Sequence, residues 1–297
     1  MSEAVVSVGA MVDVRPEPVI DLPEPVLVDL PGPARAATYV LGPDDGDAVV
    51  LCHGTPWSAR VWAPVAYALS RTYRVFLWDM PGYGASPQDA AVPVDLVAQR
   101  ERFAALLRHW SLERPHVVAH DVGGAVALGA HLFEGVDVAS LFLLDVVTLD
   151  PWGSPFFRLV AEHEQVFAAL PDALHTALVR EYIAGAANGR LDAATVDRLV
   201  GPWTGDAGRA AFYRQIAQLS PEHTRPIVRR LEQVRCPVRV GWGTDDPWIP
   251  AEQAERLRDA LPGEAEVVHF GGSGHLVPVE DADAVAGALH AWLAGSR

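Results

Sequence analysis

Short apolar runs recur along the chain and alternate with longer amphipathic stretches. The runs that predict strands cover residues 26–30, 36–41, 48–52, 73–78, 116–119, 139–144, 238–241 and 266–270. Helical periodicity lies between or after them, at residues 61–70, 95–110, 252–261 and 281–293. Strands that alternate with helices predict an α/β fold, with a mostly parallel eight-stranded sheet and helices on both faces. Ligands bind such sheets beyond the carboxyl ends of the strands.

The pattern changes between residues 150 and 221. Aromatic residues and helical periodicity continue there without a convincing strand, and core strands resume afterwards. We therefore predict a helical cap over 150–221, inserted into a core formed by 26–149 and 222–297; a separate helical domain is the alternative. Such a cap would exclude water from the site and shape its pocket. Residues 1–25 are rich in Pro and Val and predict an extended N-terminal arm.

One segment has the form of a nucleophile elbow, which is a strand, a sharp turn and a helix. Residues 117–124 read VVAHDVGG and lead into the helix-like run 125–128. Ala119 and Gly123 occupy the flanking positions, where a larger side chain would clash. This geometry predicts that Asp121 points out of the turn. The alternative is that Asp121 only caps the following helix.

A carboxylate at this position indicates a particular chemistry. It is a poor nucleophile toward acyl groups, but it can displace a leaving group from saturated carbon and form an ester that water must then cleave. No serine has elbow-type neighbours, and all 23 basic residues are arginine, which excludes lysine Schiff bases and a phosphate-loop lysine. Asp121 therefore predicts alkyl transfer followed by hydrolysis.

Partners for Asp121 follow other predicted strands. An acidic turn, TDDPWIP at 244–250, comes before the glycine-rich loop GGSGH at 271–275, which ends in His275. The order nucleophile, acid, histidine is that of α/β-hydrolase triads, so we predict that His275 is the catalytic base. Upstream, the backbone N–H of Thr55, together with that of Val122, is predicted to stabilise the oxyanion that forms when water attacks the ester.

Five motifs together carry a family resemblance. They are HGTP at 53–56, DMPGYGAS at 79–86, HDVGG at 120–124, GTDD at 243–246 and GH at 274–275. The chain resembles the α/β-hydrolase superfamily, and within it the aspartate-nucleophile branch that includes epoxide hydrolases and haloalkane or haloacetate dehalogenases. The resemblance implies the α/β-hydrolase fold. It also implies that Asp246, which fits the family spacing Gly-x-x-Asp-x-x-(Ile/Val)-Pro, orients His275. Asp145 is the alternative acid, because some relatives carry it after the sixth strand.

The same resemblance bears on the leaving group. Epoxide hydrolases use two cap tyrosines as proton donors, and Tyr182 and Tyr213 are the candidates here, with packing as the alternative role for each. Dehalogenases usually carry Trp after the nucleophile and an amide side chain at the position of Thr55, and haloacetate-type relatives carry Arg after the nucleophile. Here those positions hold Val122 and Thr55, so both depart from the dehalogenase pattern. Val122 also departs from the Trp usual in epoxide hydrolases.

We therefore expect an epoxide hydrolase-like enzyme acting on a small or natural-product substrate. The predicted substrate-binding residues are Trp57, Trp152, Tyr182 and Tyr213, and Trp57, Trp152 or Trp203 could supply donors to a halide. Three alternatives stay open: a haloalkane or haloacetate dehalogenase, a cofactor-free lyase, isomerase or cyclase in which Asp121 is a general base, and a non-catalytic ligand-binding protein.

Composition limits the partners. The chain has 297 residues, with 23 basic and 38 acidic residues and a formal charge of −15, which disfavours nucleic acid and anionic membranes. Its two cysteines, Cys52 and Cys236, cannot build a disulfide framework, and no Cys and His spacing suggests a metal. No secretory signal or membrane-spanning run is apparent. We expect a cytoplasmic, cofactor-free enzyme of a small molecule, either a monomer or a homodimer.

Overall fold

The computed structural model describes residues 21–295, and within them eight strands form one sheet. The strands are β1 (Val26–Asp29), β2 (Arg35–Leu41), β3 (Ala48–Cys52), β4 (Arg74–Asp79), β5 (His116–His120), β6 (Ser140–Leu144), β7 (Val238–Gly243) and β8 (Glu266–Phe270). Their order is β1-β2-β4-β3-β5-β6-β7-β8. β2 pairs antiparallel with β1 and β4, and every other pairing is parallel, so the predicted eight-stranded, mostly parallel sheet is confirmed.

The sequence of the central strands explains their place in the sheet. β5 and β6 are buried at every position, and β3 is buried at all but its first. A parallel strand that is covered on both faces must be apolar along its whole length, as these strands nearly are. β8, at the edge, has only Phe270 buried. The strand that precedes Asp121 is thus among the most deeply buried in the sheet, whereas the strand that precedes His275 is the exposed edge strand.

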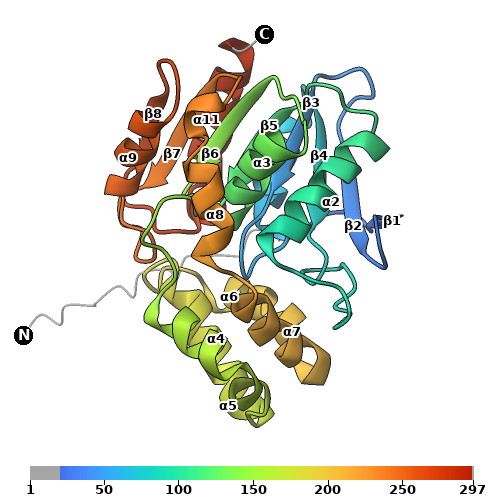
Figure 1. The fold of residues 1–297 in the computed structure, drawn as a ribbon, viewed down its shortest axis with the longest axis vertical. Helices are drawn as coiled ribbons and strands as arrows, with labels where there is room; N and C mark the ends of the chain where they lie inside the picture. Colours follow the sequence, from blue (N-terminus) through green and yellow to red (C-terminus); the bar gives the residue numbers. More distant parts are fainter. Residues whose placement is uncertain (1–20, 296–297) are drawn as a thin grey trace, which may run out of the picture.

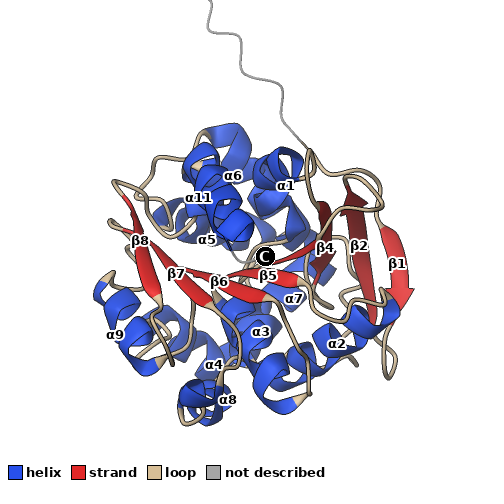
Figure 2. Cartoon of the chain, turned by 90° about the horizontal axis from the view of Figure 1, so that it is seen from above, coloured by secondary structure: helices blue, strands red, loops and turns tan. Residues whose placement is uncertain are grey.

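Helices cover both faces of the sheet. In Figure 2, α1 and α11 lie on one face, and α2, α3 and α9 lie on the other. The bounds of the core helices are α1 (Ala63–Leu69), α2 (Leu96–His109), α3 (Val122–Phe133), α9 (Glu252–Ala260), α10 (Val277–Glu280) and α11 (Ala282–Gly295), with short 3-10 helices η1 (Ala59–Trp62) and η3 (Leu231–Gln233). Among residues 21–295, no helix combines the length and the hydropathy needed to cross a bilayer.

Between β6 and β7 the chain is helical. The elements there are α4 (Pro155–Ala168), α5 (Asp172–Gly185), α6 (Ala193–Val200), η2 (Gly201–Trp203), α7 (Gly205–Ala217) and α8 (Pro221–Val228). Figure 1 shows α4 to α7 grouped at one end of the sheet, while α8 returns along the core. We call residues 150–221 the helical insertion. Of the predicted N-terminal arm, residues 1–20 lie outside the described residues.

Candidate active site

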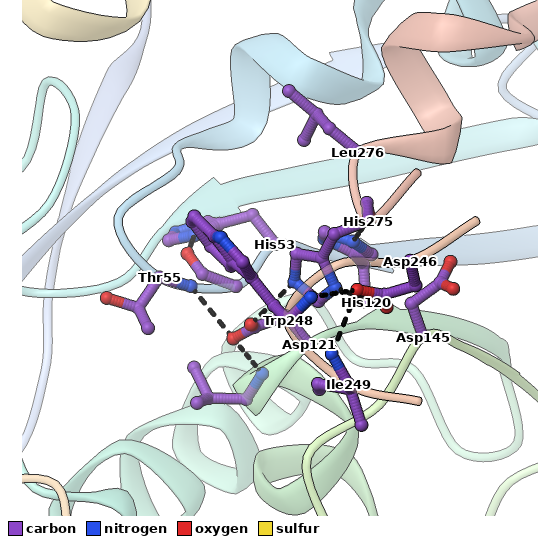
Figure 3. Close-up of polar contacts among 12 residues, drawn as sticks. His53, Thr55, His120, Asp121, Asp145, Asp246, Trp248, Ile249, His275 and Leu276 are labelled. Atoms are coloured by element: carbon purple, nitrogen blue, oxygen red, sulfur yellow. Dashed lines mark hydrogen bonds and ion pairs between the residues drawn. The ribbon is translucent and has the colours of Figure 1, made fainter. Parts of the chain in front are cut away.

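Asp121 lies in a strained turn between β5 and α3. Its φ is 53°, a backbone conformation that residues other than glycine rarely adopt, and its side chain is almost fully buried. The turn leaves no room beside it, because a Cβ at Gly123 would lie only 2.5 Å from the carbonyl oxygen of His53. This close approach agrees with the size restriction that the sequence predicts at Gly123. The turn directs the Asp121 carboxylate away from the strand, toward His275 (Figure 3).

His275 joins two carboxylates. Its Nε2 lies 2.9 Å from Oδ2 of Asp121, and its Nδ1 lies 2.8 Å from Oδ2 of Asp246 (Figure 3). An ionised carboxylate only accepts hydrogen bonds, so both ring nitrogens donate when both acids are charged. The imidazole is completely buried. The geometry therefore favours a protonated imidazole between two carboxylates.

Charge and burial act in opposite directions on this pair. Burial alone would lower the pKa of His275, but the charge of Asp246 and the hydrogen bonds to Asp121 and Asp246 raise that pKa well above its usual range. Burial would raise the pKa of Asp121, but the hydrogen bond and charge of His275 outweigh it and lower that pKa. Both shifts favour an ionised Asp121 and a protonated His275 in the resting site.

The second oxygen of Asp121 is held by backbone amides. The N–H groups of Thr55 and Val122 both donate to Oδ1, and the distance from the Thr55 nitrogen is 3.1 Å. The Thr55 hydroxyl donates to Oε1 of Gln215 on α7, which also accepts a hydrogen bond of 3.0 Å from the hydroxyl of Tyr83. The residues predicted to form the oxyanion site thus surround one oxygen, and the imidazole contacts the other.

Asp246 and Asp145 have different environments. Oδ1 of Asp246 accepts the amides of Trp248 and Ile249, at 2.7 and 2.9 Å, which turns Oδ2 toward His275. Asp145 is completely buried; its Oδ1 accepts the Gly243 amide at 2.8 Å, and its Oδ2 has no hydrogen-bond partner within residues 21–295. Burial, followed by the charge of Asp246, raises the pKa of Asp145 well above its usual range. The structure therefore brings Asp246 to the imidazole and leaves Asp145 nearby, hydrogen-bonded to the Gly243 amide.

A small cavity of about 60 Å³ opens over Asp121. The residues that line it are Thr55, Asp121, Val122, Val147, Trp152, Gly153, Ser154, Phe157, Tyr182, Trp248 and Ile249. Tyr182, one of the predicted substrate-binding residues, belongs to α5, and its hydroxyl makes no protein hydrogen bond within the described part of the chain. Burial and the charge of Asp121 raise the pKa of Tyr182 well above its usual range. Trp152 also lines the cavity, but its Nε1 donates to Thr224 at 2.9 Å.

Two predicted substrate-binding residues lie elsewhere. Tyr213 is fully buried on α7, and its hydroxyl is 2.9 Å from Nδ1 of His175. Trp57 lines a second, larger cavity of about 440 Å³ between the helical insertion and the core. Its ring stacks, with centroids 5.6 Å apart, on the ring of Trp248, which lines the smaller cavity. Trp203, considered above as a halide donor, also lines the larger cavity and donates its Nε1 to Pro56.

Sequence reasoning missed six lining residues, which are Val147, Gly153, Ser154, Phe157, Trp248 and Ile249. Trp248 and Ile249 lie within the acidic turn at 244–250, so their closeness to Asp246 was a usable signal. Phe157 lies in an amphipathic helix, where nothing in the sequence distinguishes the residue that meets the cavity. Over residues 21–295, no cluster of three or more His, Cys, Asp or Glu has an arrangement suited to a metal ion.

Comparison with known proteins gives three useful relatives, and residues 49–288 match a model of the alpha/beta hydrolase family. A solved alpha/beta hydrolase fold protein from Burkholderia ambifaria is 40% identical, with a TM-score of 0.83, over 89% of this chain and 98% of that chain. RutD of Caulobacter sp. (strain K31), a provisionally assigned carbamate hydrolase, is 30% identical over 80% of this chain and 88% of its own. A fluoroacetate dehalogenase of Burkholderia sp. is 34% identical over 106 residues, which is 34% of this chain and 35% of the dehalogenase.

Proposed function

Because the chain belongs to the alpha/beta hydrolase family, we propose that it is a hydrolase that forms an ester between Asp121 and an alkyl carbon, with an epoxide as its substrate. One observation carries this proposal. The elbow presents a carboxylate whose Oδ2 meets a histidine and whose Oδ1 meets two amides. A carboxylate placed in this way is suited to attack on saturated carbon and to hydrolysis of the resulting ester.

In the first half-reaction, Oδ2 of Asp121 attacks a ring carbon of the epoxide. A carbon–oxygen bond forms, the carbon–oxygen bond of the ring breaks, and its electron pair moves to the ring oxygen. The hydroxyl of Tyr182, in the same cavity, gives its proton to that oxygen. Because two amides hold Oδ1, Oδ2 is the attacking oxygen, and its hydrogen bond with His275 is lost as the bond to carbon forms.

In the second half-reaction, water attacks the carbonyl carbon of the ester. His275 removes a proton from that water, and the negative charge develops on Oδ1, where the amides of Thr55 and Val122 already donate. The bond between the carbonyl carbon and Oδ2 then breaks, and the alcohol leaves with Oδ2 and a proton from His275. Asp121 is released as a carboxylic acid that contains one oxygen from water, and its proton passes to the neutral His275, which restores the carboxylate and the imidazolium.

The proton balance favours an epoxide over a halide. His275 is protonated at rest but must be neutral to act as a base. Opening an epoxide consumes one proton, which Tyr182 supplies and His275 replaces. Ester formation removes the charge of Asp121, and the pKa of His275 falls with it. Loss of a halide ion would consume no proton, so the imidazolium would have to release its own to solvent.

A dehalogenase is the second candidate. It is supported by the similarity to the fluoroacetate dehalogenase of Burkholderia sp., which covers about a third of this chain. Against it, the residue after the nucleophile is Val122, and no arginine is among the residues that line the cavity. A halide would have to rely on a donor such as the indole N–H of Trp248.

A His275→Gln variant tests the proposed function. Ester formation should continue while hydrolysis fails, so mass spectrometry of the intact protein should show the added mass of the substrate on Asp121. The substrates should be a panel of small epoxides and matched alkyl halides, with diol and halide release measured for the unaltered enzyme. Turnover of both panels without any trapped ester would instead favour Asp121 as a general base, as in a lyase or isomerase. Binding without turnover would favour the non-catalytic alternative.

A further inference from the structure

A carboxylate outside the triad holds the backbone on both sides of His275. Oε2 of Glu280 accepts the amide of Gly274 at 2.9 Å, and Oε1 accepts the amide of Leu276 at 3.0 Å. The Glu280 side chain is only 6% exposed. Hydrogen bonds from amides to a charged oxygen are among the stronger ones in proteins. The residues immediately before and after the histidine are thus fixed by one side chain.

The helical insertion holds Glu280 in turn. Arg190 lies in the loop between α5 and α6, and its Nη2 is 2.9 Å from Oε2 of Glu280. The other guanidinium nitrogens bond to the carbonyls of Gly272 and Ala187. One guanidinium therefore connects its own loop, the histidine loop and Glu280.

The same α5–α6 loop makes two more contacts with the triad loops. The carbonyl of Ala186 accepts the backbone N–H of His275 itself at 2.9 Å. Asn188 donates through Nδ2 to the carbonyl of Asp245 at 2.8 Å, next to the orienting acid. The approach is so close that a Cβ on Gly274 would lie 2.7 Å from the Ala186 oxygen.

From these contacts we infer that Arg190 and Glu280 are positioning residues for His275, and we call the two together the Arg190–Glu280 clamp. The imidazole makes hydrogen bonds of 2.8 and 2.9 Å to two acids on different loops, and both require a fixed ring orientation. The clamp supplies it by fixing the backbone at Gly274 and Leu276. It also makes the triad depend on the docking of the helical insertion, so the insertion does more than cover the site.

Two variants with opposite charge changes separate positioning from a simple charge effect. Glu280→Gln removes a negative charge near His275, and Arg190→Met removes a positive one. A charge effect alone would lower the pKa of His275 in the first variant and raise it in the second. Loss of positioning weakens the bonds to Asp121 and Asp246 in both, so both variants should lower this pKa.

The experiment is an NMR titration of the histidine rings in the full chain, with the His275 signal assigned from its absence in His275→Gln. It needs no substrate, and its outcome stands apart from that of the proposed function; only the kinetic readout rests on that function. In the kinetic measurement, both variants should slow ester hydrolysis by about tenfold or more and should affect ester formation less. Arg100→Met is the matched control, because it breaks a half-buried pair with Glu134 away from the triad and should change neither quantity.

Thermal unfolding of each variant shows whether it is folded at the temperature of the titration. The Arg190 side chain is 42% exposed, so Arg190→Met should fold and can be titrated even if Glu280→Gln does not fold. The positioning role would be refuted if the two variants shifted the pKa of His275 in opposite directions. It would also be refuted if Arg190→Met matched the Arg100→Met control in both the titration and the kinetics.

Discussion

The two oxygens of the Asp121 carboxylate have different surroundings, and the proposed mechanism depends on that difference. Oδ2 faces the imidazole of His275 at 2.9 Å, and Oδ1 accepts the amides of Thr55 and Val122. The site is therefore arranged for the ester before any substrate enters, because the future carbonyl oxygen already has its donors. Preorganised donors of this kind need no rearrangement when charge develops.

At the scale of one residue, Asp145 gives a stability prediction. The pKa of Asp145 is higher in the folded state than in the unfolded chain, where it is about 4. Asp145 therefore destabilises the folded state increasingly as pH rises from about 4 toward the folded pKa. Asn cannot ionise, and it tolerates the φ of 47° found here. Asp145→Asn should therefore raise the free energy of unfolding at pH 8 on the order of 1 kcal/mol.

The gain from Asp145→Asn should shrink toward zero near pH 4, as measured by urea denaturation across this range. Catalytic activity should change little, because Asp246 and not Asp145 bonds to His275. A variant that is less stable than the unaltered protein at pH 8 would mean that the fold does not raise the pKa of Asp145. A large loss of activity would give Asp145 a part in orienting the base.

The sequence predicted the residues that follow strands better than those on helices. Asp121, Asp246 and His275 each follow a strand of the sheet, so strand order alone places them together. Tyr213 was predicted from its surrounding segment, but helical periodicity does not specify which side of α7 faces the cavity. Its hydroxyl meets His175 instead.

At the scale of elements, the loop between β8 and α10 has no room for a side chain at one of its glycines, Gly274. A Cβ on Gly274 would lie 2.7 Å from the carbonyl of Ala186, whereas a Cβ on Gly271, in the same loop, would meet nothing within 4 Å. Gly274→Ala should cost about 1–3 kcal/mol of stability by displacing a backbone contact. It should also slow ester hydrolysis, because His275 moves with its neighbour.

Gly271→Ala is the matched control and should stay within about 0.5 kcal/mol of the unaltered protein. Chemical denaturation and single-turnover kinetics measure the two effects. Equal behaviour of the two variants would mean that the α5–α6 loop is not docked against the histidine loop in solution.

The two tyrosines of the helical insertion should differ in their effects. Tyr182 lines the cavity, and its hydroxyl has no hydrogen-bond partner among residues 21–295. Tyr182→Phe should therefore slow epoxide opening by about a hundredfold while stability is kept. Tyr213→Phe removes the hydrogen bond to His175 and should cost about 1 kcal/mol with little effect on rate. Rapid-mixing kinetics of ester formation decide between them. If Tyr213→Phe gave the larger kinetic loss, α7 would have to approach the substrate.

At the scale of the whole molecule, the sheet was predictable and the docking of the helical insertion was not. Buried strands leave continuous apolar runs, which the sequence shows directly. The insertion is held against the core by hydrogen bonds of single polar residues. Examples are Gln215, which bonds to Thr55, and Arg190, which bonds to Glu280. Such contacts have no periodicity, so a pattern of apolar positions cannot reveal them.

The size of the cavity predicts the size of the substrate. About 60 Å³ over Asp121 is small beside the roughly 300–1,000 Å³ of typical ligand sites, so compact epoxides should be preferred. Phe157→Ala should enlarge the cavity and raise kcat/KM for longer epoxides, relative to short ones, by about tenfold. Phe167→Ala, on the same helix but away from the cavity, is the control. If Phe157→Ala left the preference for short over long epoxides unchanged, the substrate would instead enter through the larger cavity beside Trp57.

The covalent bond between Asp121 and the substrate is the step on which the proposed mechanism depends. It is tested most directly by one turnover in heavy-oxygen water, with enzyme in excess over an epoxide substrate, followed by mass spectrometry of the peptide that contains Asp121. We predict that one heavy oxygen appears in the Asp121 carboxylate and none in the diol, because water attacks the ester and the alcohol leaves with Oδ2. A diol that carries the label, together with an unlabelled Asp121, would show that water attacks the substrate directly and that no ester forms on Asp121.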